Sequence, residues 1–190
     1  MEETSQTYLN SDESIKDYVY KLEGIYNIMP ETGREDNLSN FIKFLEKEMQ
    51  LDLNSVKFDL NTRIKLQKYV FFAPYFDLHL GYEDTFNLYH YGPYSPTLAH
   101  DYFKLLLDWK QSDDYILPTT FKKESFKRIL QNKNVEWLEL AATAKLLFEA
   151  NKTLTIDQLT DAVSSIKGQK YNSESISAII NEAGSLLTGF

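Results

Sequence analysis

The sequence predicts a mainly α-helical fold: a multi-helix bundle around a central helix at about residues 61–80, with at most a short strand element near residues 85–91. Apolar residues recur at three- and four-residue intervals through most of the chain, which is the spacing of amphipathic helices. Capping residues precede several of these segments. Strand-like alternation is limited to short stretches, at residues 56–60 and near residues 85–91. The last three predicted helices form a helix-turn-helix-like trio.

The central helix is predicted to begin at Asn61 or Thr62, two residue types that cap helix N-termini. Pro74 lies inside its apolar pattern, where a proline removes an amide donor and crowds the preceding turn. We therefore expect a kink, or two shorter helices. The apolar stripe consists of Leu66, Tyr69, Val70, Ala73, Phe76 and Leu80.

The periodicity changes after the central helix. Phe86 and Leu88 alternate with their neighbours, which permits a short strand, and Gly92–Pro93 predicts a turn. Ser95–Pro96 predicts a helix start, because serine caps helices and proline suits the first helical position. The buried face predicted for that helix consists of Leu98, Tyr102, Leu105, Leu106 and Trp109.

The C-terminal part of the chain is predicted to be entirely helical. A short helix is expected at residues 121–130 and a longer one at residues 135–150. Thr155 and Gln158 have the spacing of a capping box, which predicts a third helix that stops at Gly168. The last helix is expected to run from a cap at Ser173 to Leu187.

Two parts are expected along the chain. Residues 1–60 are predicted to form an acidic N-terminal extension with two helices, one at Ile15–Ile28 and one that begins after a cap at Ser39. This part holds 6 Lys and Arg against 13 Asp and Glu, which accounts for most of the net charge of −8. Residues 61–190 are predicted to form one compact helical unit.

The composition excludes several classes of function. The chain has no cysteine, so disulfides, thiolate nucleophiles and thiolate metal sites are excluded. No run of about 18 apolar residues predicts a membrane span. The first residues are acidic and polar, unlike a secretory signal, so a cytoplasmic protein is expected. The net negative charge disfavours nucleic acid as a partner, because phosphate backbones repel it.

Two stretches resemble a known family. The first is Lys65-Leu66-Gln67-Lys68-Tyr69-Val70-Phe71-Phe72-Ala73. The second is Tyr89-His90-Tyr91-Gly92-Pro93-Tyr94-Ser95-Pro96-Thr97-Leu98, which continues to Asp101-Tyr102. In order and spacing they resemble the Panacea domain, the family of SocA-like antitoxins and their bacterial and archaeal relatives. The resemblance covers residues 61–110. It implies a protein-binding role, in which a partner toxin is neutralised or presented to a protease, and it implies no enzymatic reaction.

The resemblance and the turn together give the candidate partner-binding residues. In one interpretation, an exposed loop with two tyrosines before a helix N-terminus holds a peptide or an anion. In the other, glycine and proline set the turn while the tyrosines pack against the Lys65–Ala73 helix. Lys65 and Lys68 are expected to be solvated charges on the polar side of that helix. The candidate residues are Lys65, Lys68, Tyr91, Gly92, Pro93, Tyr94 and Ser95.

Three alternatives to a plain protein-binding role remain open. His79, His90 and His100, with Asp101 beside the last, could form a metal or acid–base site, but their spacing matches no ligand motif. His90 is expected to be the most buried of the three. A nucleic-acid-binding regulator would use the C-terminal trio, although residues 173–187 contain no Lys or Arg. Homo-oligomerisation is the third.

Enzyme signatures are missing from the sequence. It has no Gly-rich phosphate loop, no G-x-S-x-G and no H-E-x-x-H pattern, and it has only seven glycines. We therefore expect no catalysis, no cofactor and no metal. The leading hypothesis is a non-catalytic, antitoxin-like module that binds another protein, such as a toxin encoded nearby.

Overall fold

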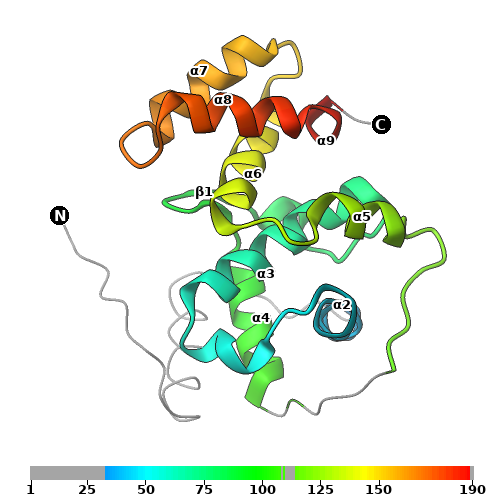
Figure 1. Cartoon of the computed structure of the whole chain (residues 1–190). Coiled ribbons are helices and arrows are strands. Elements are labelled where there is room, and N and C mark those ends of the chain that lie inside the picture. Colours follow the sequence, from blue (N-terminus) through cyan, green and yellow to red (C-terminus); the bar gives the residue numbers. More distant parts are fainter. Residues whose placement is uncertain (1–32, 108, 110–113, 189–190) are drawn as a thin grey trace. The chain divides into compact units, whose positions relative to one another are not determined.

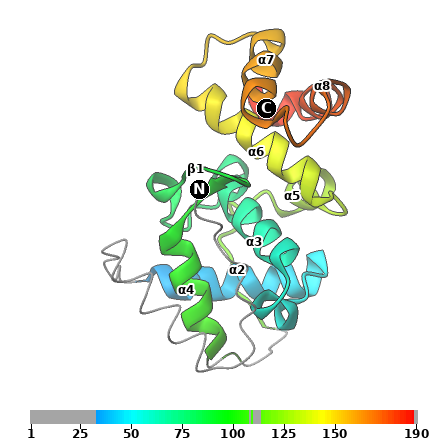
Figure 2. The ribbon, with the colours of Figure 1, turned by 90° about the vertical axis from the view of Figure 1, so that its left-hand side faces the viewer.

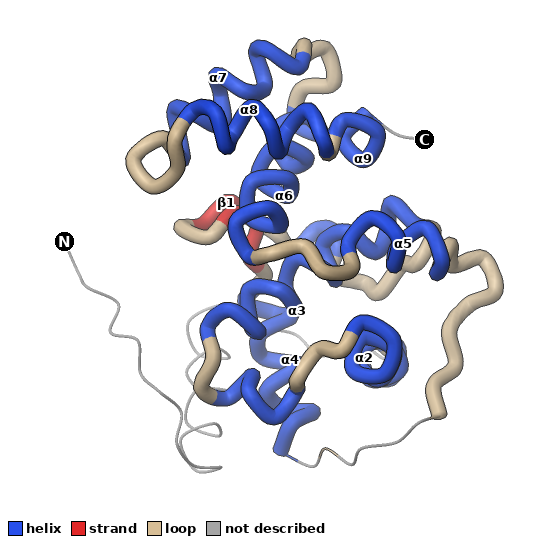
Figure 3. The backbone as a smooth tube through the Cα atoms, in the orientation of Figure 1, coloured by secondary structure: helices blue, strands red, loops and turns tan. Residues whose placement is uncertain are grey.

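The prediction of a mainly helical fold is confirmed. The computed structural model describes residues 33–107, 109 and 114–188, and in these ranges it contains eight α-helices and one two-stranded antiparallel sheet (Figures 1 and 3). None of the helices in the described ranges is long and apolar enough to cross a membrane. The predicted helix at Ile15–Ile28 lies outside the described residues.

The chain divides into two compact units, each made of two separate segments. Unit 1 contains residues 1–63 and 96–117, and unit 2 contains residues 64–95 and 118–190. The division after residue 63 lies close to the predicted boundary at residue 60. The helix after Ser95–Pro96, however, belongs to the same unit as the N-terminal part of the chain.

Unit 1 is built around two packed helices, α2 (Arg34–Met49) and α4 (Pro96–Leu107). The predicted cap at Ser39 is wrong, since α2 begins five residues earlier. Gly33 takes a left-handed conformation with φ 87° and its carbonyl accepts the first helical bond, from the amide of Asn37. Acidic residues in the first turn of α2 favour this earlier start, because they complement the helix dipole.

Unit 2 contains most of α3 (Leu60–Phe72), which is followed by a 3₁₀ turn, η2 (Ala73–Phe76). The expected effect of Pro74 is confirmed, because the α-helix ends before it and the proline occupies the start of the tighter turn. A second short turn, η3 (Glu83–Thr85), leads into the sheet. Unit 2 also contains a short helix, α5 (Lys123–Leu130).

A small hairpin interrupts the helices of unit 2. Strand β1 (Asn87–Tyr89) pairs antiparallel with strand β2 (Gly92–Tyr94), in a register that places Leu88 opposite Pro93. The predicted turn at Gly92–Pro93 is wrong, since the chain reverses at His90–Tyr91. Gly92 has φ 78°, which suits the residue that closes a hairpin loop. Pro93 lacks an amide donor, which a strand in a two-stranded sheet tolerates.

The C-terminal helices of unit 2 pack against one another as predicted in outline. Helices α7 (Ile156–Lys167) and α8 (Ser173–Glu182) both contact α6 (Val135–Ala150) and each other (Figures 1 and 2). The capping box of Thr155 and Gln158 is present, and Gly168 ends α7. The predicted cap of the last helix is displaced by one residue to Asn172. That helix also breaks at Ala183, after which α9 (Gly184–Thr188) follows.

Candidate functional site

Helix α3 holds the second strand of the hairpin through two neighbouring polar residues. The side-chain amide of Gln67 donates to the carbonyl of Ser95 and accepts from its amide, both at 3.0 Å. The ammonium of Lys68 donates to the carbonyl of Pro93 at 2.5 Å. All these groups are buried. The two sequence stretches that carry the family resemblance are therefore joined by hydrogen bonds inside unit 2.

Lys68 is a buried charge, and the expectation that it would be solvated is wrong. Only 1% of the residue is exposed to solvent. Burial lowers the pKa of Lys68 to about 7, and the nearby carboxylate of Glu139 opposes this effect. The ammonium groups of Lys167 and Lys170 lower the pKa further.

Glu139, on α6, is fully buried and gathers the positive charges around it. Its carboxylate oxygens lie 2.8 Å from the ammonium of Lys167 and 2.7 Å from that of Lys170. The hydroxyl of Tyr171 donates to it at 2.9 Å. Burial would raise the pKa of Glu139, but the hydrogen bonds from the two lysines outweigh burial and hold the pKa below its usual value. We call Lys68, Glu139, Lys167 and Lys170 the lysine–glutamate cluster.

The lysine–glutamate cluster also fixes the hairpin loop. The ammonium of Lys167 donates to the carbonyl of His90, and that of Lys170 lies 4.5 Å from the centre of the Tyr91 ring. Gly92 approaches α6 so closely that a β-carbon there would lie 2.8 Å from the hydroxyl of Thr143. The hairpin is therefore held from α3, α6 and the end of α7.

Only part of the predicted partner-binding set reaches the surface. Lys65, Tyr91 and Tyr94 are partly exposed. Lys68, Gly92, Pro93 and Ser95 are buried and form the internal support of the hairpin. These four residues cannot contact a partner unless the unit rearranges.

Strand β1 contributes exposed hairpin residues that are not among the predicted partner-binding residues. All three residues of β1 are exposed, and Leu88 and Tyr89 keep 40% and 41% of their surface in contact with solvent. The ring of Tyr89 packs edge-on against Tyr94 at 5.3 Å. An aliphatic and an aromatic residue in succession break the strand alternation, and this break is the signal that could have identified them.

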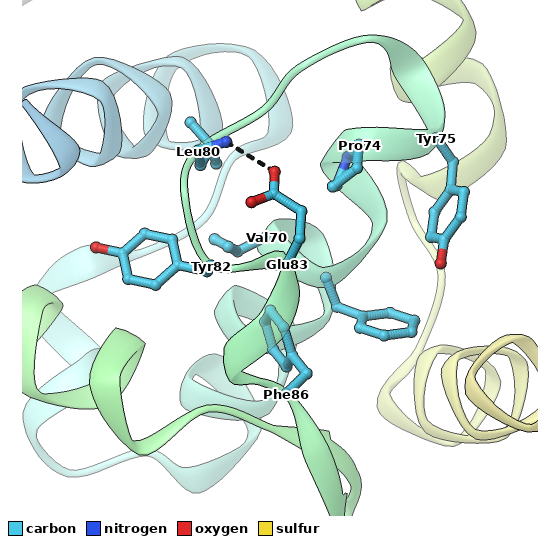
Figure 4. A pocket seen from close by; sticks show the side chains of 8 residues that line it. Val70, Pro74, Tyr75, Leu80, Tyr82, Glu83 and Phe86 are labelled. Carbon is cyan, nitrogen blue, oxygen red and sulfur yellow. Dashed lines mark hydrogen bonds between the residues drawn. The ribbon is translucent and has the colours of Figure 1, made fainter. Parts of the chain in front are cut away.

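A small cavity lies beside the hairpin, with a volume of about 100 Å³. Figure 4 shows its lining side chains, with the Glu83 carboxylate among apolar groups and the amide of Leu80 donating to it at 3.2 Å. Phe86, which directly precedes β1, forms part of the wall. The lining residues are Val70, Phe71, Pro74, Tyr75, Leu80, Tyr82, Glu83 and Phe86.

The three histidines differ in burial and in their hydrogen-bond partners. His79 and His90 are exposed, which contradicts the expected burial of His90. His100 is the buried one: its Nδ1 lies 2.7 Å from Asp101, whose carboxylate also accepts from Arg34 at 2.9 Å within unit 1. In the part of the chain that the structure describes, no group of three His, Cys, Asp or Glu residues could hold a metal ion.

The C-terminal trio carries no basic surface on its last long helix. Glu174 and Glu182 are exposed on α8, and α8 contains no Lys or Arg. A recognition helix needs side chains that bind phosphates and base edges. Nothing in α8 favours nucleic acid over another partner.

The pH dependence of stability provides a test of the buried state of Lys68. Because its folded pKa of about 7 lies below that of an unfolded lysine, the unfolded state binds more protons between pH 7 and about 10. Stability should therefore rise with pH in this window. Relative to Lys68→Met, we expect the free energy of unfolding of the wild type to rise by about 2 kcal/mol between pH 7 and pH 9.

This difference can be measured by urea unfolding followed through Trp137 on α6, in a Trp109→Phe background that leaves one tryptophan in the chain. Groups whose surroundings the substitution leaves unchanged contribute equally in both proteins and cancel in the comparison. Equal pH dependence in the wild type and Lys68→Met would show that Lys68 keeps an ordinary pKa.

No protein-family model, curated protein or solved structure matches this chain. The resemblance of residues 61–110 to the Panacea domain therefore stays a prediction. A functional proposal must therefore rest on two features of the described residues. One is the hairpin, which buried side chains anchor and whose strand β1 is exposed. The other is the small apolar cavity that contains one carboxylate.

Proposed function

We propose that the chain is a non-catalytic protein-interaction module, antitoxin-like in its role, which binds its partner protein through the exposed strand of the hairpin. The observation that carries this proposal is β1, which displays Leu88 and Tyr89 to solvent. Three side chains that anchor the hairpin backbone, those of Gln67, Lys68 and Lys167, are buried. Tyrosine is among the residues most enriched at the energetic centres of interfaces.

The rigidity of the hairpin supports the proposal. Association costs conformational entropy, and a surface already fixed in one conformation loses less of it. Hydrogen bonds from Gln67, Lys68 and Lys167 anchor the backbone of β2, Ser95 and the hairpin loop. Gln67, Lys68 and the buried residues of β2 would then support the hairpin, while β1 would make the contacts with the partner.

The proposal includes the kind of partner and the cellular compartment. The resemblance to antitoxins favours a partner encoded near this chain, such as a toxin, and the lack of cysteine suits a reducing cytoplasm. The net charge of −8 and the acidic α8 disfavour the nucleic-acid alternative. Self-association through β1 is a competing outcome that the test below separates.

Co-expression with the product of the neighbouring gene tests the proposal. If that product alone stops growth, this chain should restore growth, and the two proteins should co-purify. We expect Leu88→Ser combined with Tyr89→Ser to weaken the complex at least tenfold, because interface centres lose 1–2 kcal/mol or more per truncated anchor. Surface plasmon resonance with purified proteins measures this change.

Ile116→Ser provides the matched control, since Ile116 is 83% exposed and lies in unit 1. This variant should change affinity less than twofold. We call the double variant Leu88→Ser/Tyr89→Ser the hairpin variant. If it binds the partner as tightly as the wild type does, β1 is not the binding surface. A partner-free dimer that the hairpin variant abolishes, seen by light scattering, would assign β1 to self-association instead.

A further inference from the structure

We propose that the cavity beside the hairpin receives a lysine or arginine side chain of the protein bound at β1; this inference rests on the proposed function. The cavity is small, at about 100 Å³, whereas sites for cofactors and drug-sized ligands have volumes of about 300–1,000 Å³. A single side chain is therefore a better match to its size than a free metabolite. Phe86 connects the cavity directly to β1 in the chain.

The walls of the cavity suit the stem of a long basic side chain. Val70, Pro74 and Leu80 provide aliphatic surface, and aromatic rings line the rest. The ring of Phe71 lies edge-on to that of Phe86 at 5.3 Å and to that of Tyr75 at 6.2 Å. Lysine and arginine stems pack along apolar surface, and their charged ends are attracted to aromatic rings.

The carboxylate of Glu83 selects the charge of the ligand. Its Oε1 accepts from the amide of Leu80 and lies 3.2 Å from Nδ1 of the exposed His79. Its Oε2 has no hydrogen-bond partner among the described residues. A neutral apolar ligand would remove water from this oxygen without replacing the lost hydrogen bonds, and an anion would be repelled. A guanidinium or ammonium group satisfies it.

One cation already lies near the cavity wall, but it is neutralised. The ammonium of Lys145 lies 4.2 Å from the centre of the Tyr75 ring, and it pairs with Glu149 at 2.9 Å. It also donates to the carbonyl of Leu187 at 2.7 Å. Its charge is thus balanced within unit 2, and the carboxylate of Glu83 remains for a ligand.

The test uses the full chain and n-butylguanidinium, a fragment with the charge and stem of arginine. We expect the amide resonance of Leu80, which reports on Glu83, to shift in ¹H–¹⁵N spectra with a Kd on the order of 1 mM. The neutral isostere n-butylurea should bind at least fivefold more weakly. Equal affinity for the two fragments, or no shift at Leu80, would overturn the inference.

Two variants sharpen the test by removing one charge each. Glu83→Gln keeps an oxygen that can accept from the Leu80 amide, and it should weaken the binding of n-butylguanidinium about fivefold or more. Asp84→Asn removes the neighbouring charge, which lies outside the cavity lining, and should change the affinity less than twofold. Equal losses in both variants would indicate general electrostatic attraction and contradict a specific site.

The fragment titration needs no partner protein, so its failure is distinct from that of the proposed function. If the fragment binds as expected but the hairpin variant keeps full partner affinity, β1 is not the docking surface. If the hairpin variant loses the partner but the fragment shows no charge preference, the cavity does not receive a basic side chain.

Discussion

Replacing Glu139 with alanine is expected to lower the free energy of unfolding of unit 2 by about 3–5 kcal/mol, since the loss of one partner leaves buried charges uncompensated. Lys68 and Lys167 are both buried, and Glu139 is the carboxylate that pairs with Lys167 and opposes the effect of burial on Lys68. Urea unfolding of the Trp109→Phe background, followed by Trp137 fluorescence, measures the loss.

Glu136→Gln provides the control on the same helix. Glu136 lies in the first turn of α6, is partly exposed, and forms no ion pair within the described ranges. Its loss should cost less than about 1 kcal/mol, through the helix dipole alone. Adding Lys167→Met to Glu139→Ala should recover part of the stability, because one uncompensated charge is removed. A loss below 1 kcal/mol in Glu139→Ala would show that the cluster is solvated.

Replacing Gly92 with alanine is expected to lower the free energy of unfolding by about 2–4 kcal/mol. One part is conformational, because φ 78° is unfavourable for a residue with a β-carbon. The other part is steric, since that β-carbon would lie 2.8 Å from the Thr143 hydroxyl and 3.2 Å from the carbonyl oxygen of Glu139. The same Trp137 unfolding measurement applies.

The substitution Thr143→Ala separates the conformational part of the Gly92→Ala stability loss from the steric part. In the Gly92→Ala/Thr143→Ala double variant, the closest steric contact is gone. The loss of unfolding free energy in the double variant should therefore be at least about 1 kcal/mol smaller than the sum of the losses in the two single variants. Gly184→Ala is the control in the same unit, because a β-carbon there meets no atom within 4 Å. Strict additivity of Gly92→Ala and Thr143→Ala would contradict the close approach of the hairpin to α6.

Local signals in the sequence were sufficient for several helix boundaries. Pro74, the Thr155–Gln158 capping box and Ser95–Pro96 act within one turn of the chain, and the helices end or begin where these residues predict. The start of α2 was missed because its cap is a glycine in a left-handed conformation, which carries no side-chain signal.

The charge state of the site could not be predicted in this way. Lys68 has the helical spacing of a surface residue relative to Lys65, and its counterion comes from α6, far along the chain. Likewise, Gly92–Pro93 has the composition of a turn, but close packing against α6 places it in a strand. Only the tertiary arrangement distinguishes a solvated lysine from one that supports a hairpin.

The interleaved segments of the two units have a consequence for deletion mapping. Ending the chain after Ser95 would remove α4 from unit 1 and α5 to α9 from unit 2, so both units would lose part of their cores. Starting it at Ile64 would leave α4 without α2. No single contiguous fragment contains one complete unit alone. A shortened chain would therefore lose binding because it fails to fold, whether or not the binding region had been removed. Point substitutions in the chain of 190 residues are the appropriate way to locate its contacts.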